Sequence, residues 1–472
     1  VDSSNELLAE YAKRRGSCVI IKGLRAATDF ENEFQMAQLN HQLSPEVETL
    51  SRAEMQALQL KRLQEIVAYA YENVPFYKKK YDEAGVKPSD IKSLEDIQKL
   101  PFVTKADLRD NYPYGFLSVP LEEIARIHAS SGTSGKPTVV AYTQEDMEIW
   151  TECVARLVAA GGGRKGDIVQ ICFGYGLFTG ALGLHQGWER IGAAVIPAST
   201  GNTERQLMLM KDLKTTAIVC TPSYALHLAE EMNRLGYKKE DFHLRVGMFG
   251  SEASSDEMHA EIARKLHLFP TDNYGLSELI GPGVSGECEQ KQGMHVNEDH
   301  FFAEILDPTT FQPLPEGEYG ELVLTSLTKK SMPMIRYRTK DITKLDYSPC
   351  ACGRTTARMA KLKGRTDDML VVKGVNVFPS QIEGVLYTFK ELGSFYEIIV
   401  SREDYKDKLE VKAELVDDSI VGDYGRLEEL AKKVRHALKT VLQIDVKLSL
   451  VEHLSLKRFE GKAKRVIDLR KY

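Results

Sequence analysis

The chain of 472 residues is longer than one domain usually is, and its composition, 43% hydrophobic and 28% charged, is that of an ordinary globular protein. Its net charge of -6 and its mixed acidic and basic residues exclude the basic stripe of a nucleic-acid-binding protein, and no apolar run has membrane-spanning length. Seven scattered cysteines, an odd number, and the lack of a signal peptide predict a cytoplasmic protein with reduced thiols.

Residues 1–48 differ in character from the rest of the chain. Residues 5–12 are typical of a helix and residues 18–21 of a buried strand, and a Gly-Leu-Arg run follows at 23–25. The stretch from 5 to 48 resembles an internal piece of pantetheine-phosphate adenylyltransferase around that family's Gly-Leu-Arg loop. The catalytic N-terminal strand and the histidine-containing nucleotide loop of that family are absent. We therefore interpret residues 1–48 as an appendage or fusion remnant without that activity.

The next segment, up to about residue 112, is predicted to be helical. Ser51 and Glu54 form a capping-box pattern that begins a helix, and Pro75 ends it. Apolar residues recur at helical spacing along it: Leu63, Ile66, Val67 and Ala70. Helical hairpins that serve as packing scaffold are expected for the remainder.

A glycine-rich turn at residues 130–137 follows a predicted short strand at 125–129. Two glycines allow close backbone approach to an anion, while hydroxyls and one ammonium add donors, which predicts a polyphosphate-binding loop. Only two residues separate the glycines and a proline follows the lysine, so the turn is not a Walker A loop. Its candidate phosphate-binding residues are Ser131, Gly132, Thr133, Ser134, Gly135 and Lys136.

From about 125 to 345, short apolar strands alternate with helices, which predicts an α/β domain with a largely parallel sheet. The strand candidates are 169–172, 194–197, 217–220 and 246–249, and the clearest helices between them are 204–214 and 224–235. Ligands in such sheets bind at the carboxyl ends of the strands. The glycine-rich turn and the segments below mostly occupy such ends.

After about residue 368 the pattern changes to a small α+β unit of roughly a hundred residues. Strands are expected at 394–402, 408–416 and 445–454, and a helix at 426–441. That helix has one apolar face: Leu427, Leu430, Val434, Leu438 and Val441. The unit ends in a Lys/Arg/Gly-rich tail at 457–465 that is predicted to be loose.

Several further segments suit a nucleotide. Residues 272–278 place an aromatic, a glycine, a hydroxyl and a carboxylate in one predicted turn, where Glu278 offers Mg²⁺ the hard oxygen ligand it prefers. The residues after the strand at 246–249 are predicted to form a ledge against a nucleobase: Gly250, Ser251, Glu252 and Ala253. The Asp341 carboxylate is suited to bind ribose hydroxyls. Residues 364–368, at the boundary between the two units, are predicted to form a hinge.

The order of these segments resembles the adenylate-forming superfamily of acyl-CoA ligases, from about residue 49 to the C-terminus. Within this superfamily, the residues of five segments resemble motifs of the phenylacetate–CoA ligase family: 130–133, 175–180, 220–224, 274–283 and 374–379. The resemblance implies an α/β fold with a large N-terminal adenylate-forming domain, residues 49–366, whose sheet is rich in parallel strands. A small mobile α+β lid domain, residues 367–472, is implied to follow it.

The resemblance also implies two half-reactions. A carboxylate attacks the α-phosphorus of ATP, giving acyl-adenylate and pyrophosphate, and the CoA thiol then attacks the acyl carbon and releases AMP. ATP, CoA and Mg²⁺ would be the cofactors, and an arylacetate, with phenylacetate ahead of indole-3-acetate, would be the acid. The alternative is an adenylating enzyme that passes the acyl group to an amine or a carrier-protein thiol. A homodimer through the helical N-terminal region is a further expectation.

The resemblance assigns roles to particular residues. Lys462 would supply the ammonium for adenylation, with Lys464 as a competitor, Glu278 would hold magnesium, Asp367 would be the hinge, and Gly374 would lie near the pantetheine tunnel. An acyl pocket suited to a flat ring is assigned to Tyr175, Phe178, Thr179 and Gly180. The remaining nucleotide-binding residues would be Asn273, Tyr274, Gly275, Ser277, Asp341 and Arg365.

A cysteine pair at Cys350 and Cys352, followed by a glycine, resembles half a zinc knuckle. With Cys288 and His295 it would supply three thiolates and one imidazole, the donor set of a tetrahedral structural zinc site. His300 is an alternative to His295, and unpaired cytoplasmic thiols are the competing interpretation. Some members of the ligase family carry a similar Cys-x-Cys-Gly-Arg-Thr segment, which favours the zinc site.

Overall fold

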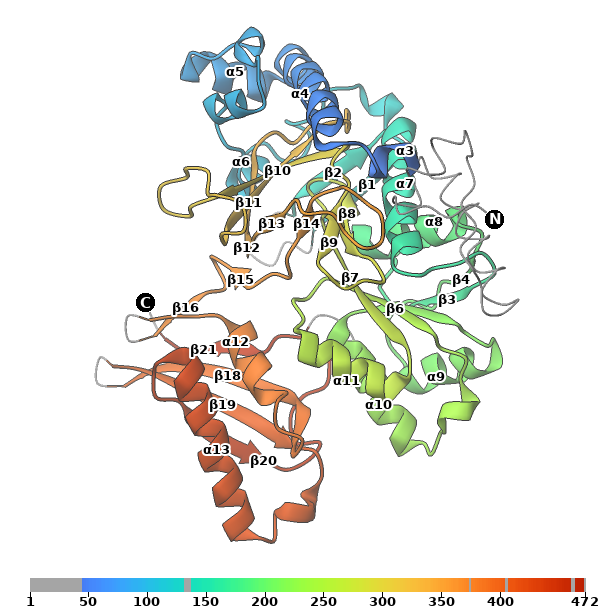
Figure 1. Ribbon diagram of the computed structural model, residues 1–472, viewed down its shortest axis with the longest axis vertical. Coiled ribbons are helices and arrows are strands. Elements are labelled where there is room, and N and C mark those ends of the chain that lie inside the picture. The colour runs from blue at the N-terminus through green and yellow to red at the C-terminus, as the bar shows by residue number, and fades with distance from the viewer. Residues whose placement is uncertain (1–44, 131–136, 373–374, 404–405, 460–462, 471–472) are drawn as a thin grey trace, which may run out of the picture.

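A computed structural model describes residues 45–130, 137–372, 375–403, 406–459 and 463–470. The predictions for residues 1–44, for the glycine-rich turn from Ser131 to Lys136, and for Gly374 and Lys462 lie outside the described residues. Figure 1 shows a large unit above a smaller C-terminal unit, with helices α10 and α11 of the large unit beside the smaller one. Each unit has an apolar core of its own.

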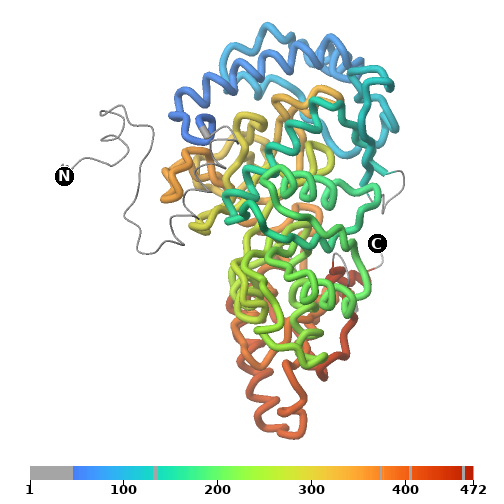
Figure 2. The backbone as a smooth tube through the Cα atoms, turned by 90° about the vertical axis from the view of Figure 1, so that its right-hand side faces the viewer, coloured from blue at the N-terminus to red at the C-terminus, as the bar shows by residue number. Residues whose placement is uncertain are grey.

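The N-terminal helices cover the end of the molecule opposite to the C-terminal unit, as Figure 2 shows. They are α3 (Pro45–Glu48), α4 (Arg52–Asn73), α5 (Pro75–Ala84) and α6 (Lys105–Asp110). The predicted capping box is confirmed, because the Ser51 amide donates to the Glu54 carboxylate at 2.9 Å and the Glu54 amide donates to the Ser51 hydroxyl at 3.3 Å. The four apolar residues predicted for the inner face of α4 are buried.

The central sheet has nine strands, and the α/β prediction is confirmed. Its parallel half contains β3 (Ile168–Ile171), β4 (Ala194–Ile196), β5 (Ala217–Cys220), β6 (Val246–Phe249) and β7 (Phe269–Leu276). Its other half is antiparallel and contains β8 (Gly281–Glu287), β9 (Met294–Val296), β13 (Leu345–Asp346) and β14 (Arg358–Met359). The sheet is therefore mixed, because the short connections from β7 to β8 and from β8 to β9 leave no room for the helical crossovers that parallel strands need.

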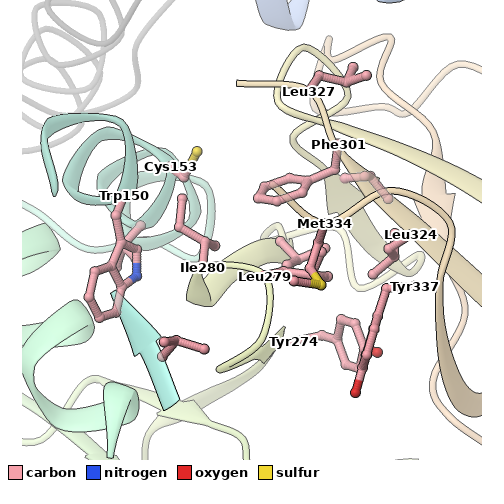
Figure 3. Packing of buried hydrophobic residues seen from close by; sticks show 14 of the residues in the cluster. Trp150, Cys153, Tyr274, Leu279, Ile280, Phe301, Leu324, Leu327, Met334 and Tyr337 are labelled. Carbon is pink, nitrogen blue, oxygen red and sulfur yellow. The ribbon is translucent and has the colours of Figure 1, made fainter. Parts of the chain in front are cut away.

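Five helices accompany the sheet: α7 (Gln144–Ala160), α8 (Thr179–Arg190), α9 (Thr203–Asp212), α10 (Pro222–Arg234) and α11 (Asp256–Leu266). Both α7 and α8 pack on β8. The Trp150 indole of α7 donates to the Pro282 carbonyl at 2.7 Å, and Figure 3 shows this ring in the core close to Ile280. Within the described ranges, none of the helices has the length and apolar character of a membrane span.

Two smaller sheets complete the large unit. A hairpin of β1 (Arg126–Ala129), which was predicted, and β2 (Val139–Tyr142) flanks the glycine-rich turn. A four-stranded antiparallel sheet, which was not predicted, contains β10 (Phe301–Leu306), β11 (Gly320–Ser326), β12 (Tyr337–Thr343) and β15 (Gly364–Arg365). Its last strand leads directly into the C-terminal unit.

The C-terminal unit is α+β, as predicted. It contains β16 (Leu370–Val372), β17 (Val375–Val377), α12 (Pro379–Leu386), β18 (Leu392–Glu403), β19 (Lys406–Leu415), α13 (Tyr424–Leu442), β20 (Lys447–Val451) and β21 (Val466–Asp468). One core residue was predicted wrongly: Val441 is 46% exposed, and Leu442 is buried instead. Leu442 lies four residues after Leu438, so it falls on the same helix face.

The prediction of a loose tail at 457–465 is wrong for two of its arginines. Arg458 binds Glu414 of its own unit at 2.5 and 2.8 Å and lies 3.3 Å from Glu230 of α10 in the large unit. Arg465 is stacked 4.2 Å over the Tyr396 ring. Charge density suggested solvent exposure, but guanidinium groups paired with carboxylates and stacked on rings are also stable in buried positions.

Candidate active site

Two of the predicted nucleotide segments meet at the carboxyl ends of β6 and β7. The Asn273 side-chain amide donates to the Phe249 carbonyl at 2.7 Å. A Cβ atom on Gly250 would lie 2.8 Å from the Asn273 carbonyl oxygen, so this close approach requires a glycine. Ser251 follows with a φ of 68°, which turns the chain away from the strand. The ledge predicted at 250–253 is therefore attached directly to the segment predicted at 272–278.

The prediction that residues 272–278 form one turn is wrong. Strand β7 continues to Leu276, with an irregular register between Tyr274 and Gly275, and only Ser277 and Glu278 lie in the turn that follows. A Cβ atom on Gly275 would lie 1.8 Å from the Gly281 carbonyl oxygen. The pairing of β7 with β8 prolongs the strand, and this pairing could not be seen from the local composition.

Strands β12 and β15 join the predicted ribose site to the predicted hinge. Asp341 is the register partner of Arg365, whose guanidinium approaches its carboxylate at 3.4 Å and binds Asp367 at 2.9 Å. The Tyr274 hydroxyl donates to the other Asp341 oxygen at 2.6 Å. Burial raises the pKa of Asp341 to about 6, while Tyr274 and Arg365 oppose the shift. The structure thus brings together Tyr274, Asp341 and Arg365, as the nucleotide prediction requires.

The predicted acyl segment at 175–180 follows β3 and touches both neighbouring parts of the site. The Ala129 amide, at the end of β1, donates to the Leu177 carbonyl at 2.9 Å. The hydroxyls of Thr179 and Ser277 lie 3.0 Å apart, and the Tyr175 hydroxyl bonds His185 at 3.0 Å. The Phe178 side chain is 49% exposed, so an apolar ring is available beside these polar contacts. Gly180 is the second residue of α8 and has open space where a Cβ would be.

Glu278 is a second buried acidic group of the site, beside Asp341. Its side chain is nearly inaccessible, and the Lys105 ammonium, from the start of α6, lies 3.7 Å from its carboxylate. Burial and the Glu278 charge raise the pKa of Tyr337 well above its ordinary value. Figure 3 shows the rings of Tyr337 and Tyr274 at the same side of the core. Sequence reasoning missed Lys105, since one lysine in a helical scaffold carries no distinguishing signal.

A second lysine that the sequence did not single out is Lys329. Its side chain is 1% exposed, and its ammonium lies 4.3 Å from the centre of the Tyr142 ring on β2. Burial lowers its pKa to about 8, and the negative charges of Asp146 and Glu278 oppose that shift. The Tyr142 hydroxyl in turn donates to the Ser277 carbonyl at 3.4 Å.

The ledge residue Glu252 is engaged by the C-terminal tail. Its carboxylate accepts a hydrogen bond of 2.7 Å from the Ser223 hydroxyl and another from the backbone amide of Ala463. Ala463 follows directly after Lys462, which lies outside the described residues. The tail that carries the predicted catalytic lysine is therefore attached to the nucleotide ledge of the large unit.

The four predicted zinc ligands are brought together at the edge of the central sheet formed by β8, β9 and β14. The donor atoms of Cys288, His295, Cys350 and Cys352 all lie within 4.8 Å of one another. The sulfurs of Cys288 and Cys350 are 3.8 Å apart, and Cys352 Sγ is 3.4 Å from His295 Nε2. Tetrahedral zinc would separate two sulfurs by about 3.8 Å and a sulfur from a nitrogen by about 3.6 Å. The arrangement therefore fits zinc.

Contacts around these ligands orient them. Thr356 Oγ1 bonds His295 Nδ1 at 3.0 Å, so Nε2 faces the sulfurs. Cys288 and His295 hold the pKa of the Cys352 thiol well below its ordinary value. The alternative ligand His300 is excluded by geometry, since its ring bonds Asp299 and Thr328 instead. All six cysteines of the described chain are free thiols.

A second cluster of potential metal ligands contains His259, Asp272 and Glu287. Two lysines already occupy it: Lys291 binds Glu287 and lies 3.1 Å from His259 Nδ1, and Lys361 lies 3.3 Å from Asp272. The other nitrogen of His259 bonds Asp272 at 3.0 Å. Burial would raise the pKa of Asp272, but the His259 bond and the two lysines lower it overall.

The family described as AMP-binding enzyme matches residues 32–328, and its C-terminal domain matches residues 374–470. The phenylacetate–coenzyme A ligase of Thermus thermophilus is 47% identical over 441 residues, which cover 90% of this chain and 99% of that protein. The chain belongs to the phenylacetate–coenzyme A ligase family. The member of this family from Escherichia coli is 48% identical over 433 residues, which cover 91% of this chain and 98% of that protein.

Solved structures relate this family member to two states of a 2-hydroxyisobutyryl-CoA ligase that is 32% identical. Its postadenylation state, in complex with an acyl-AMP, superimposes with a TM-score of 0.86 over 90% of this chain and 92% of that one. Its thioesterification state, with acyl-AMP and CoA, gives only 0.67 over 90% and 91%. The two units of this chain are therefore arranged as in the postadenylation state.

A separate short match concerns a different enzyme. The phosphopantetheine adenylyltransferase of Herpetosiphon aurantiacus is 54% identical over 50 residues, which cover 11% of this chain and 30% of that protein. This agrees with the predicted resemblance of residues 5–48, most of which lie outside the described residues. A match to less than a third of the adenylyltransferase gives no ground for its activity in this chain.

Proposed function

We propose that this chain activates an arylacetic acid, phenylacetate first among them, with ATP and transfers it to CoA. In the first step the carboxylate oxygen bonds the α-phosphorus of ATP and pyrophosphate leaves. In the second the CoA sulfur bonds the acyl carbon, loses its proton, and AMP leaves. The observation that carries the proposal is the meeting of the acyl segment with the nucleotide segments at Thr179 and Ser277, in a chain that belongs to the phenylacetate–coenzyme A ligase family.

The nucleotide would lie at the carboxyl ends of β6 and β7. Asp341, oriented by Tyr274, would accept the ribose hydroxyls, and the ledge at 250–253 would face the base. Phosphates would be bound by the glycine-rich turn, with Ser131, Gly132, Thr133, Ser134, Gly135 and Lys136. Glu278 would hold Mg²⁺, which offsets phosphate charge when bound. Lys462 would place its ammonium between the two anionic reactants.

The second half-reaction would require the C-terminal unit to turn about Asp367. In the present arrangement the tail contacts the ledge through Ala463 and Glu252, which suits adenylation. Turning would withdraw Lys462 and open a path for pantetheine near Gly374. The lower TM-score against a thioesterification state supports this proposal, since that state differs from the arrangement described above.

We also propose that Cys288, His295, Cys350 and Cys352 hold a structural zinc ion. The four donors face one another and would complete a tetrahedral ligand set, and no described residue of the nucleotide site is among them. When bound, the ion would fasten the loop that precedes β14 to β8 and β9. The site would therefore stabilise the fold instead of taking part in the reaction.

The test is pyrophosphate release from ATP and Mg²⁺ over a panel of acids, with and without CoA. The panel contains phenylacetate, indole-3-acetate, benzoate and short and medium fatty acids. Sustained release that requires both an arylacetate and CoA supports the proposal. Release that is indifferent to CoA would instead support an adenylating enzyme with an amine or carrier-protein thiol as acceptor. Absence of release with every acid would reject both.

A half-reaction assay tests the catalytic lysine. Lys462→Ala should abolish adenylation while leaving thioester formation from supplied acyl-adenylate and CoA nearly unchanged, because the ammonium is needed only where two anions meet. Lys464→Ala is the matched control, two residues away. Equal losses in both half-reactions would show that Lys462 supports the fold or the position of the C-terminal unit instead.

A further inference from the structure

Lys329 is a buried cation with no hydrogen-bond partner among the described residues. Its side chain is fully buried, and its Nζ atom makes no hydrogen bond with any part of the chain that the structure describes. The Tyr142 ring face, 4.3 Å away, supplies only a cation–π contact and leaves the N–H groups of the ammonium unsatisfied. A buried ammonium in this condition lowers the stability of the folded state. Such violations of packing rules are characteristic of functional sites.

The backbone around Lys329 is held firmly in place. Asp146 accepts hydrogen bonds from the amides of Lys330 and Ser331, at 2.9 and 3.2 Å. The Ser331 hydroxyl donates to the Ala141 carbonyl at 2.6 Å. The Asp146 carboxylate is therefore used by the backbone and forms no ion pair with Lys329. The backbone that carries the Lys329 side chain is thus fixed by these hydrogen bonds.

That position borders the reaction site. Tyr142 lies on β2, directly after the glycine-rich turn, and its hydroxyl reaches the Ser277 carbonyl. The Ser277 hydroxyl contacts Thr179 of the acyl segment at 3.0 Å. The next residue, Glu278, is close enough for its charge to act on Lys329, but the cation that approaches it within 4 Å is Lys105. Lys329 thus lies near the place where the acyl and nucleotide segments meet, and no described carboxylate forms an ion pair with it.

We propose that the Lys329 ammonium binds an oxyanion of the adenylation half-reaction by a direct charge-assisted hydrogen bond. Two sources carry this chemistry: the carboxylate of the acid, and the phosphate chain shared by ATP and pyrophosphate. Either would satisfy the orphaned donor and bring a positive charge to a step in which two anions meet. The inference rests on the proposed ligase function and adds to it a residue outside the segments that the family resemblance assigned.

The test compares Lys329→Met with Lys330→Met in the full-length protein. Met keeps the length of the side chain and removes its charge, and Lys330 is the neighbouring lysine, half exposed and 3.5 Å from Glu145. ATP–pyrophosphate exchange gives KM values for the acid, for Mg-ATP and for pyrophosphate. Lys329→Met should raise either the KM for the acid or the KM values for Mg-ATP and pyrophosphate by about 10- to 100-fold, since a hydrogen bond to a charged group is lost. It should also raise the melting temperature, which a merely structural lysine would not do.

The three KM values identify the source. A rise confined to the acid assigns the carboxylate, and a rise for Mg-ATP and pyrophosphate assigns the phosphates. KM values within twofold of wild type for all three overturn the proposal, as does a lowered melting temperature. Lys329→Gln is the second variant should Lys329→Met not fold, and failure of both to fold would also overturn it. Absence of exchange by the wild-type chain rejects the proposed function instead.

Discussion

In the described part of the chain, two buried clusters have the composition of metal sites, but they differ in the charges that surround their ligands. The cysteine cluster contains thiolates and an imidazole, and Arg354 beside it is paired with Glu48 at 2.9 Å. Its histidine directs Nε2 to the sulfurs, because Nδ1 is bonded to Thr356. No ammonium lies among its donor atoms within the described chain. A zinc ion bound here would offset the charge of coordinating thiolates.

The carboxylate cluster already contains its cations. Lys291 and Lys361 neutralise Asp272 and Glu287, and both ring nitrogens of His259 are bonded, one to Lys291 and the other to Asp272. No lone pair of the imidazole is free for a metal. Ligand types alone therefore do not identify a metal site, and the charges and hydrogen bonds around the ligands decide it.

The largest expected effect is the loss of the cysteine cluster. Cys350→Ala should abolish bound zinc and lower the free energy of unfolding by more than about 3 kcal/mol, because metal-binding energy contributes to folding. The measurements are metal content and denaturant unfolding with and without a chelator. Cys220→Ala, at a buried thiol far from the cluster, is the control for cavity formation. Metal-free wild-type protein of unchanged stability would contradict the zinc proposal.

Next in size is the effect of removing a cation from the carboxylate cluster. Lys361→Met should cost about 2–4 kcal/mol in the free energy of unfolding, since Asp272 and Glu287 would remain buried with less compensation. Metal content should not change. Lys344→Met, at another lysine that lines the same surface pocket as Lys361, serves as the control. If Lys361→Met instead acquires a divalent ion without loss of stability, the contrast between the two clusters is wrong.

The carboxylate cluster should also make the free energy of unfolding fall at acidic pH. Because the pKa of Asp272 in the folded state lies below its ordinary value of 3.8, its contribution is complete above that value and is lost as the pH falls through the lower folded value. The stability difference between wild type and Asp272→Asn should therefore narrow as the pH is lowered from about 5 to 3. Urea unfolding across this range measures it. A difference that stays constant would show that Asp272 is not stabilised as a carboxylate.

The smallest effect is expected for His259→Gln. Glutamine retains one donor for Asp272 but loses the acceptor for Lys291, so about 1 kcal/mol of unfolding free energy should be lost. Metal content and the half-reactions should remain as in wild type. A loss of bound metal in this variant would mean that the carboxylate cluster is a metal site after all.

The strands and the cysteine cluster could be predicted from the sequence because they depend on local composition. The apolar runs at 217–220 and 246–249 became β5 and β6 because a strand covered on both sides needs no alternation. The cysteines were predicted because few side chains can serve as zinc ligands. The sequence did not decide between His295 and His300 as the fourth ligand. That decision depends on the pairing of β9 with β14, which brings residues far apart in the chain together.

The misses among the strands share one physical cause, which is pairing between strands that local composition does not show. The extension of β7 to Leu276 depends on β8, and the sheet that contains Asp341 depends on pairings such as that of Asp341 with Arg365, 24 residues apart. Lys329 gave no signal, because a lysine followed by another lysine is typical of a solvated turn. Only the fold shows that Lys329 points inward while Lys330 is half exposed.

Arg458 joins the two units unequally. Its bonds to Glu414, in its own unit, are 2.5 and 2.8 Å long, whereas Glu230 of α10 lies at 3.3 Å. If the C-terminal unit turns, the longer bond is the one that has to break, and the shorter ones travel with the guanidinium. The contact between Arg458 and Glu230 is thus the one that separates when the units move apart. Arg458 keeps the Glu414 carboxylate as its counter-charge. Rotation should accordingly return the Glu230 carboxylate of α10 to water and also break the hydrogen bond between the Ala463 amide and Glu252.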